Sequence, residues 1–132
     1  MKLLVFGILA SLASADVGTA GFYSDPYLST ACTGDDSSGF PTDNLFIAAG
    51  DGIWDNGASC GRQYLVRCIS TRLPNACKQS TIQVKVVDRW DNRRTGRKSS
   101  PRATMLLSNT AWDAIVDRSK RYNEVNIEFQ QV

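Results

Sequence analysis

The side chains able to carry out acid–base chemistry near neutral pH in this 132-residue chain are carboxylates, because the sequence contains no histidine. Histidine is the commonest general base and the commonest metal ligand, so its absence excludes Ser-His-Asp and Cys-His mechanisms. Thirteen Asp and Glu residues remain as candidate proton donors and acceptors. Any catalysis would therefore depend on carboxylates, and we expect neither a metal ion nor a cofactor.

Basic side chains are concentrated in one segment, although the whole chain has a formal net charge of only +2, which gives no support for nucleic-acid binding. Residues 89–102 carry six Lys and Arg residues and one carboxylate, that of Asp91. Gly96 and Pro101 within this segment indicate a loop. We interpret it either as a solvated loop without a partner or as a polyanion-binding loop, with candidate residues Arg93, Arg94, Arg97 and Lys98.

The N-terminus has the pattern of a secretory signal peptide. Lys2 precedes an apolar run over residues 3–12, and Ala13-Ser14-Ala15 offers the small residues of a cleavage site. The apolar run is about half as long as the roughly 20 residues that a membrane-spanning helix needs. We therefore expect residues 1–15 to be removed and residues 16–132 to form one secreted, extracellular domain without a transmembrane anchor.

The four cysteines, an even number in an exported chain, predict two disulfide bonds rather than a zinc site. Four cysteines allow three pairings, and their spacing does not choose among them. If Cys32 pairs with Cys60 and Cys68 with Cys77, the chain-entropy model gives about 3–4 and about 2.5–3 kcal/mol of stabilisation. We expect these cysteines to stabilise the fold and not to act as reactive thiols.

Hydrophobic alternation predicts a mainly β domain. Apolar residues recur at every second position in residues 64–68, 82–86 and 125–129, which is the pattern of half-buried strands. Residues 19–23 and 45–49 are further short strand candidates. Turn-forming residues between these runs indicate loops, and a glycine-rich loop over residues 50–59 has room for one helical turn around Trp54.

One helix is expected near the C-terminus. Ser108 has the residue type that caps helix N-termini, and the apolar residues Ala111, Trp112, Ile115 and Val116 that follow it lie on one helical face. Five or six short strands with one or two short helices suggest a small barrel.

Several segments, read in order along the chain, resemble one known family. They are residues 18–23 (GTAGFY), 30–34 (TACTG), 53–62 (IWDNGASCGR), 64–68 (YLVRC), 75–77 (NAC) and the Leu107-Ser108 helix start with Ala111-Trp112. On these residues the chain resembles the plant natriuretic peptide group of the expansin-like, EG45-type proteins, which are related to RlpA and barwin. The resemblance implies a small six-stranded double-psi β-barrel with disulfides Cys32–Cys60 and Cys68–Cys77.

The departures from the family pattern bear on catalysis. Asp88 matches the aspartate that follows the Val-Lys-Val-Val strand, but Leu106 occupies the position of a second family aspartate, and Gly21 replaces a threonine that lines the acidic site. Glycoside hydrolysis ordinarily uses two carboxylates. We therefore predict that the protein is not an enzyme. Asp88 then serves either as a structural hydrogen-bond acceptor or as a ligand contact.

Aromatic side chains are the remaining candidates for a binding site, because sugar rings pack on exposed aromatic faces. Beside Asp88, the predicted groove residues are Tyr23, Asp25 and Trp90, with Tyr27 and Trp54 as further aromatic candidates. The competing interpretation, favoured for Trp54 and Trp112, is that these rings belong to the core.

We predict a secreted, noncatalytic, monomeric protein of the apoplast or cell wall. Its expected partner is a cell-wall polysaccharide, with acidic polymers such as pectin for the basic loop, or a plant surface receptor in signalling on water and ion balance. A microbial effector that mimics such plant proteins is a second hypothesis. The third is a weak endoglucanase or lytic transglycosylase, in which Asp88 works with Asp25 or Asp55.

Overall fold

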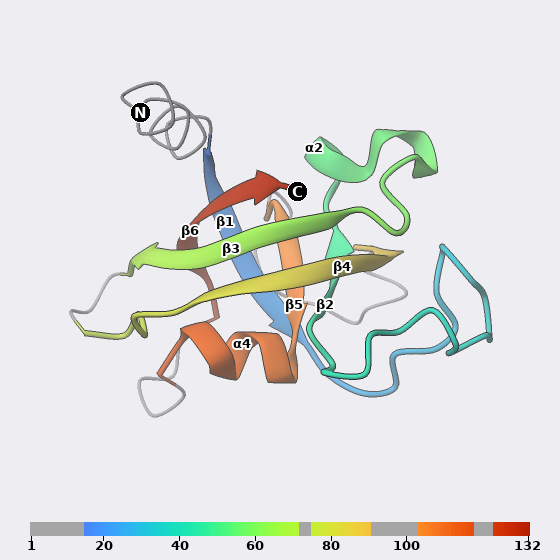
Figure 1. The fold of residues 1–132 in the computed structure, drawn as a ribbon, viewed down its shortest axis with the longest axis horizontal. Helices are drawn as coiled ribbons and strands as arrows, with labels where there is room; N and C mark the ends of the chain where they lie inside the picture. The colour runs from blue at the N-terminus through green and yellow to red at the C-terminus, as the bar shows by residue number, and fades with distance from the viewer. Residues whose placement is uncertain (1–14, 72–74, 91–102, 118–122) are drawn as a thin grey trace, which may run out of the picture.

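A computed structural model describes residues 15–71, 75–90, 103–117 and 123–132. Its six strands are β1 (Asp16–Tyr23), β2 (Phe46–Ala49), β3 (Gln63–Ser70), β4 (Thr81–Arg89), β5 (Met105–Ser108) and β6 (Val125–Gln131). They close a barrel in the order β1-β5-β2-β4-β3-β6 (Figure 1). The predicted mainly β, six-stranded barrel is confirmed.

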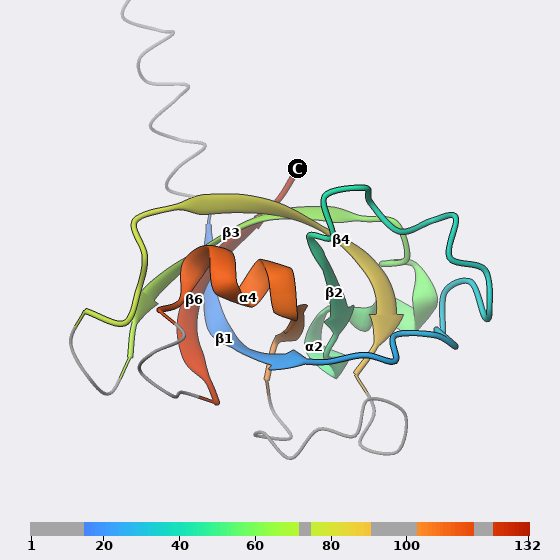
Figure 2. The same cartoon turned by 90° about the horizontal axis from the view of Figure 1, so that it is seen from below.

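The strand order is not the chain order, because the barrel contains parallel pairs. β1 is parallel to β5 and β2 is parallel to β4, whereas the other four pairs are antiparallel. Parallel pairing requires long connections between strands. Helix α2 (Asp51–Trp54) with the 3-10 turn η1 (Asp55–Gly57) lies on the route from β2 to β4. Helix α4 (Asn109–Ile115) joins β5 to β6 and lies across one end of the barrel (Figures 1 and 2).

Helix α4 begins where the sequence predicts. The Ser108 hydroxyl accepts a hydrogen bond from the Ala111 amide at 3.2 Å and lies 2.6 Å from the Asn44 carbonyl, to which it donates. It therefore caps the helix and fastens the preceding loop. Ala111, Trp112 and Ile115 are buried against the barrel, which confirms the predicted apolar face.

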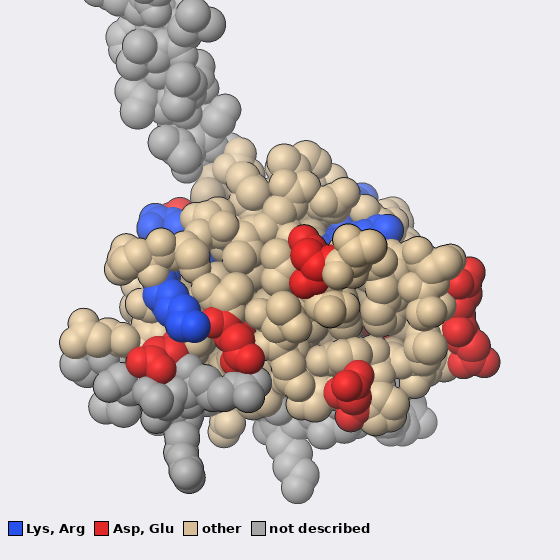
Figure 3. Space-filling view, turned by 60° about the horizontal axis from the view of Figure 1, so that its bottom comes forward, with Lys and Arg blue, Asp and Glu red and all other residues tan. Residues whose placement is uncertain are grey.

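The longest described connection, residues 24–45, runs from β1 to β2 and is here called the cover loop. It contains four aspartates and no lysine or arginine. These are Asp25, Asp35, Asp36 and Asp43, and all four are exposed. Figure 3 shows acidic side chains along the edge of the molecule that this loop forms. The cover loop is therefore an acidic surface.

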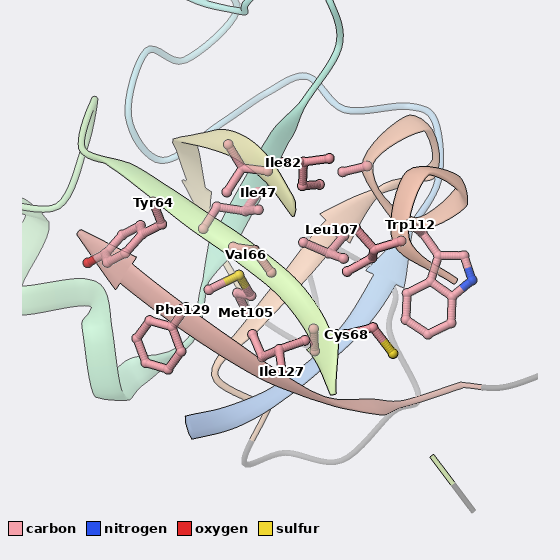
Figure 4. Packing of buried hydrophobic residues seen from close by; sticks show 14 of the residues in the cluster. Ile47, Tyr64, Val66, Cys68, Ile82, Met105, Leu107, Trp112, Ile127 and Phe129 are labelled. Atoms are coloured by element: carbon pink, nitrogen blue, oxygen red, sulfur yellow. The ribbon is translucent and has the colours of Figure 1, made fainter. Parts of the chain in front are cut away.

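Apolar side chains fill the inside of the barrel. The alternating residues of β3, β4 and β6 point inward, as their periodicity predicts, and pack with residues of the other strands and of α4 into one group, here called the interior cluster (Figure 4). It includes Val66, Val84, Met105, Leu107 and Ile127, all fully buried. This cluster accounts for the hydrophobic period of two in the sequence.

A second apolar group, the outer cluster, covers the opposite face of β1, β5, β2 and the end of β4. It consists of Tyr23, Phe46, Ala48, Val87, Trp90, Ala103 and Leu106, with Tyr27 and Phe40 of the cover loop packed against it. β2 and β5 are consequently buried on both faces. This explains their continuous apolar sequences. Because such a sequence does not alternate, β5 was not among the predicted strands.

Both disulfides have the pairing that the family resemblance implies. Cys32 is bonded to Cys60, which ties the cover loop to the segment after η1, and Cys68 is bonded to Cys77 between β3 and β4.

β1 starts at Asp16, three residues earlier than predicted, because residues 16–20 pair with β6.

Residues 1–14 of the predicted signal peptide lie outside the described residues. Among the described residues, no helix has the length and apolar character that spanning a membrane requires.

Candidate functional site

Four residues on neighbouring strands form one row across the outer face of the barrel. The register pairs Gly21 with Leu106, Leu106 with Ala48, and Ala48 with Asp88. Directly paired residues point to the same face of a sheet. The row therefore brings together the three positions at which the sequence was compared with the family site, namely Gly21, Leu106 and Asp88.

A bulge in β4 turns Asp88 toward this face. Ile47 pairs with Val86, but the next β2 residue, Ala48, pairs with Asp88, so that Val87 is an extra residue. Strict alternation from Val84 and Val86 would direct Asp88 into the barrel. Bulges of this kind change the direction of a side chain and occur often beside functional sites.

The carboxylate of Asp88 is buried, with 2% of the residue exposed. Its Oδ1 accepts hydrogen bonds from the backbone amides of Ala31 and Arg89, each at 2.8 Å. The bond from Ala31 links β4 to the cover loop across 57 positions of the sequence. Asp88 thus acts as an acceptor that fixes the cover loop over the outer cluster. Whether it also contacts a ligand stays a prediction.

Tyr23 and Trp90 are the aromatic members of the predicted groove, and both are buried, with 3% and 8% of each residue exposed. Neither ring is exposed enough for a sugar to stack on it. The hydroxyl of Tyr23 and the indole nitrogen of Trp90 have no hydrogen-bond partner among the described residues. Two buried donors without partners thus lie in the same cluster of side chains.

The environment of the Tyr23 hydroxyl favours its neutral form. Burial raises the pKa of Tyr23 above the usual tyrosine value, and the nearby charge of Asp88 and the Tyr27 hydroxyl raise it further. Tyr23 therefore remains a neutral, buried donor over the physiological pH range.

Tyr27 connects the cover loop with both β1 and α4. Its hydroxyl donates to the Tyr23 carbonyl at 3.2 Å and accepts from the Asn109 amide at 3.1 Å. The pKa of Tyr27 is raised, mainly by burial and also by the charges of Asp25 and Asp113. The hydrogen bond from the Asn109 amide acts in the opposite direction. Asp25 itself is exposed at the edge of the site.

The other carboxylate proposed for catalysis lies on the segment that contains α2 and η1. Asp55 forms an ion pair with Arg62 at 2.7 Å, and its neighbour Asp51 pairs with Arg89 at 2.9 Å. The Arg89 guanidinium also lies 5.9 Å from the ring centre of Trp54, which is half-buried at the margin of the interior cluster. The predicted helical turn at Trp54 is present.

The predicted polyanion-binding residues Arg93, Arg94, Arg97 and Lys98 lie outside the described residues. The ends of that segment, Trp90 and Ala103, belong to the outer cluster. The role of the cover loop, whose Tyr27 and Phe40 pack against the outer cluster, was not predicted from the sequence. Aromatic residues in an otherwise polar loop were the available signal.

Comparisons with solved structures define the fold. An expansin of Clavibacter michiganensis superimposes with a TM-score of 0.60 at 20% identity over 89% of this chain and 50% of that one. A mutant of a Clavibacter michiganensis expansin in complex with cellohexaose gives a TM-score of 0.63 at 19% identity, again over half of its length. A GH45 endoglucanase mutant in complex with cellobiose gives 0.58 at 10% identity over 89% of this chain and 81% of that one. The barrel is therefore that of expansins and GH45 endoglucanases.

Sequence comparison gives the family, although no family model matches the chain. An EG45-like domain containing protein of Citrus jambhiri is 32% identical over 94% of this chain and 87% of its own length. EG45-like domain containing protein 2 of Arabidopsis thaliana is 39% identical over 65% of each chain. The chain belongs to the EG45-like domain containing proteins, which confirms the EG45-type resemblance. Membership of the natriuretic peptide group stays a prediction.

Proposed function

We propose that this protein is a noncatalytic, expansin-like protein of the plant cell wall or apoplast that binds wall polysaccharide. Its family and its fold support this assignment. An expansin with the same barrel has been captured with cellohexaose, which supports a glucan as the first ligand to test.

The observation that carries the proposal is the position of Leu106. This side chain is fully buried in the row that ends at Asp88, with Ala48 between them. Glycosidases ordinarily place two carboxylates about 5–9.5 Å apart, one to protonate the leaving group and one to act as nucleophile or base. A leucine can do neither, and Asp88 uses one oxygen to accept two backbone hydrogen bonds.

Export to the apoplast is part of the same proposal. The predicted signal peptide precedes Asp16, where the first strand begins. Both disulfides are formed in the folded domain, and such bonds persist in oxidising compartments. Within this proposal, a microbial effector that mimics such plant proteins and a role in water and ion signalling are the alternative forms of the function.

The charge of the protein surface predicts how its retention on each polymer depends on salt. The acidic cover loop opposes the approach of a polyanion, so retention on pectin would depend on the basic residues of the predicted loop. Retention on cellulose or chitin would be insensitive to salt, because these polymers are uncharged.

The test is a pull-down of the oxidised protein on insoluble cellulose, chitin and pectin at low and high salt, with reducing-sugar release measured on the same samples. We expect retention without sugar release. A variant with Arg93, Arg94, Arg97 and Lys98 changed to Gln should lose pectin retention selectively. The exposed residue Arg67 on β3, which pairs with Glu128 at 2.8 Å, provides a single-charge control outside the loop as Arg67→Gln.

Two outcomes would contradict the proposal. Sugar release that is abolished by Asp88→Asn would show that the protein is an enzyme. Absence of retention on every polymer would exclude polysaccharide binding, and a proteinaceous receptor would then be the partner to seek.

A further inference from the structure

The two disulfides lie in different environments. Cys68 is 6% exposed and is a member of the interior cluster, where its side chain lies among core residues (Figure 4). Cys32 and Cys60 are both half-buried and join two surface segments, the cover loop and the turn after η1. Cys77 is half-buried as well, so both cysteines of Cys32–Cys60 but only one cysteine of Cys68–Cys77 are accessible to a reagent in solution.

A cavity of about 210 Å³ lies against the Cys32–Cys60 bond. It is lined by Cys32, Cys60, Thr33, Gly39, Gly61, Lys85, Val86 and Val87. Thr33 and Gly61 are exposed at its margin, so the cavity is accessible from solvent. Its volume is several times the roughly 30 Å³ that one water molecule occupies in the liquid. A small molecule can thus approach the sulfur atoms.

Lys85 provides a positive charge in the same cavity. Its ammonium group donates a hydrogen bond to the Gly39 carbonyl of the cover loop at 2.7 Å. An ammonium group has three protons, and a cation beside a disulfide favours both an approaching thiolate and the thiolate that leaves. The cavity therefore combines access with a positively charged lining residue, which favours thiol–disulfide exchange.

We propose that Cys32–Cys60 is a thiol-exchange site for small thiols and that its reduction loosens the cover loop from the outer cluster. A thiolate attacks one cysteine sulfur and forms a mixed disulfide, while the Cys32–Cys60 bond breaks and its electron pair leaves on the other sulfur. A second thiol molecule attacks the mixed disulfide. The products are two reduced cysteines, which take up the two protons, and the disulfide of the small thiol.

The attachments of the cover loop explain why reduction loosens it. Next to Cys32, the loop is joined to the barrel by the hydrogen bond from Ala31 to Asp88, and further along by the bond from Lys85 to Gly39. Cys32–Cys60 is its one covalent attachment among the described residues other than the chain itself. Without that bond, opening the loop requires only the loss of hydrogen bonds and of the contacts of Tyr27 and Phe40 with the outer cluster.

The first experiment treats the oxidised full chain with reduced glutathione, quenches by alkylation and identifies the modified cysteines by mass spectrometry. We expect Cys32 and Cys60 to be reduced about tenfold faster than Cys68 and Cys77, because access controls the exchange rate. Equal rates, or faster reduction of Cys68–Cys77, would overturn the proposal.

The role of Lys85 is tested by Lys85→Gln. Loss of a partly exposed charge should slow reduction of Cys32–Cys60 about two- to fivefold, and the effect should shrink at high salt. Lys78 stands next to Cys77 in the other disulfide, so Lys78→Gln is a matched control with the same change in charge, and it should leave the Cys32–Cys60 rate unchanged. An unchanged rate in Lys85→Gln would contradict the charge effect.

Loosening of the loop is measured by amide hydrogen exchange on the oxidised and the selectively reduced protein. The amide of Ala31 should exchange faster after reduction, together with those of Thr30 and Gly34, which bond to each other within the loop. The amides of β3 should be unchanged. If the loop amides exchange equally in both forms, reduction does not release the loop. The double variant Cys32→Ser/Cys60→Ser gives the same comparison without a reductant.

Discussion

The interior and outer clusters are both apolar, but they are enclosed in different ways. The interior cluster is surrounded by six strands and closed at one end by α4. The outer cluster lies on one face of the barrel under the cover loop, and it contains the unpartnered donors of Tyr23 and Trp90. We therefore expect the interior cluster to contribute most of the stability, while the predicted groove residues Tyr23 and Trp90 belong to the outer one.

Two adjacent leucines test this difference most strongly. Leu107 belongs to the interior cluster and Leu106 to the outer one, and both are fully buried. Leu107→Ala should cost about 3–5 kcal/mol, because the closed barrel cannot collapse around the cavity. Leu106→Ala should cost about 2–3 kcal/mol, since the cover loop can relax. Urea unfolding measures both, and a larger cost for Leu106→Ala would contradict the comparison.

The disulfides provide the next largest difference. Cys32–Cys60 spans 28 positions and Cys68–Cys77 spans 9. In the chain-entropy model, replacing the first pair by serine costs about 3.6 kcal/mol and replacing the second about 2.7 kcal/mol. Thermal unfolding of the two double variants tests this order. The reverse order would mean that packing of Cys68 in the interior cluster outweighs loop closure.

Asp88→Ala should destabilise the protein by about 2–3 kcal/mol, because the backbone amides of Ala31 and Arg89 each lose their acceptor in a partly buried setting. Asp88→Asn keeps a side-chain oxygen at this position and should cost less, about 1 kcal/mol. Chemical denaturation gives both values. A negligible cost for Asp88→Ala would show that Asp88 does not hold the cover loop.

The smallest change in the free energy of unfolding at neutral pH is expected for Tyr23→Phe, since the Tyr23 hydroxyl has no hydrogen-bond partner among the described residues. The change should be within about 0.5 kcal/mol. Above pH 10.0, the usual tyrosine pKa, the unfolded chain releases a proton that folded Tyr23 retains, so the free energy of unfolding falls as pH rises. Tyr23 should lower the free energy of unfolding by about 1.4 kcal/mol per pH unit in this range, and Tyr23→Phe should abolish that contribution. Urea unfolding at several alkaline pH values measures it. An identical pH dependence in both proteins would mean that Tyr23 ionises normally.

Much of the barrel could be predicted from sequence because interior residues alternate. The strands that contain Val66, Val84 and Ile127 follow a period of two, and the Ser108 cap defined α4. β5 escaped prediction because Leu106 and Leu107 are buried on opposite faces, so no polar residue marks the alternation. The start of β1 escaped because Val17 is 68% exposed although its backbone pairs with β6.

The sequence could predict which residues share the face of the candidate site, but not that their side chains are buried. Asp88 and Leu106 do lie on one face, as comparison with the family suggests. Tyr23 and Trp90 belong to a cluster that Tyr27 and Phe40 of the cover loop pack against, and the folding of a loop back over a sheet leaves no periodic pattern in the sequence. The bulge at Val87, which turns Asp88 outward, likewise has no local signal.

Gly50 has a consequence for engineering this fold. The Gly50 amide donates to the Thr104 carbonyl at 2.9 Å, and the Trp90 amide donates to the Ala49 carbonyl at 2.7 Å. A Cβ at position 50 would lie 2.2 Å from the Ala103 carbonyl oxygen, so only glycine permits this approach. The two ends of the 91–102 segment are thereby anchored to consecutive residues at the end of β2. A replacement of the residues between Trp90 and Ala103 should therefore leave these bonds and the strands of the barrel unaltered.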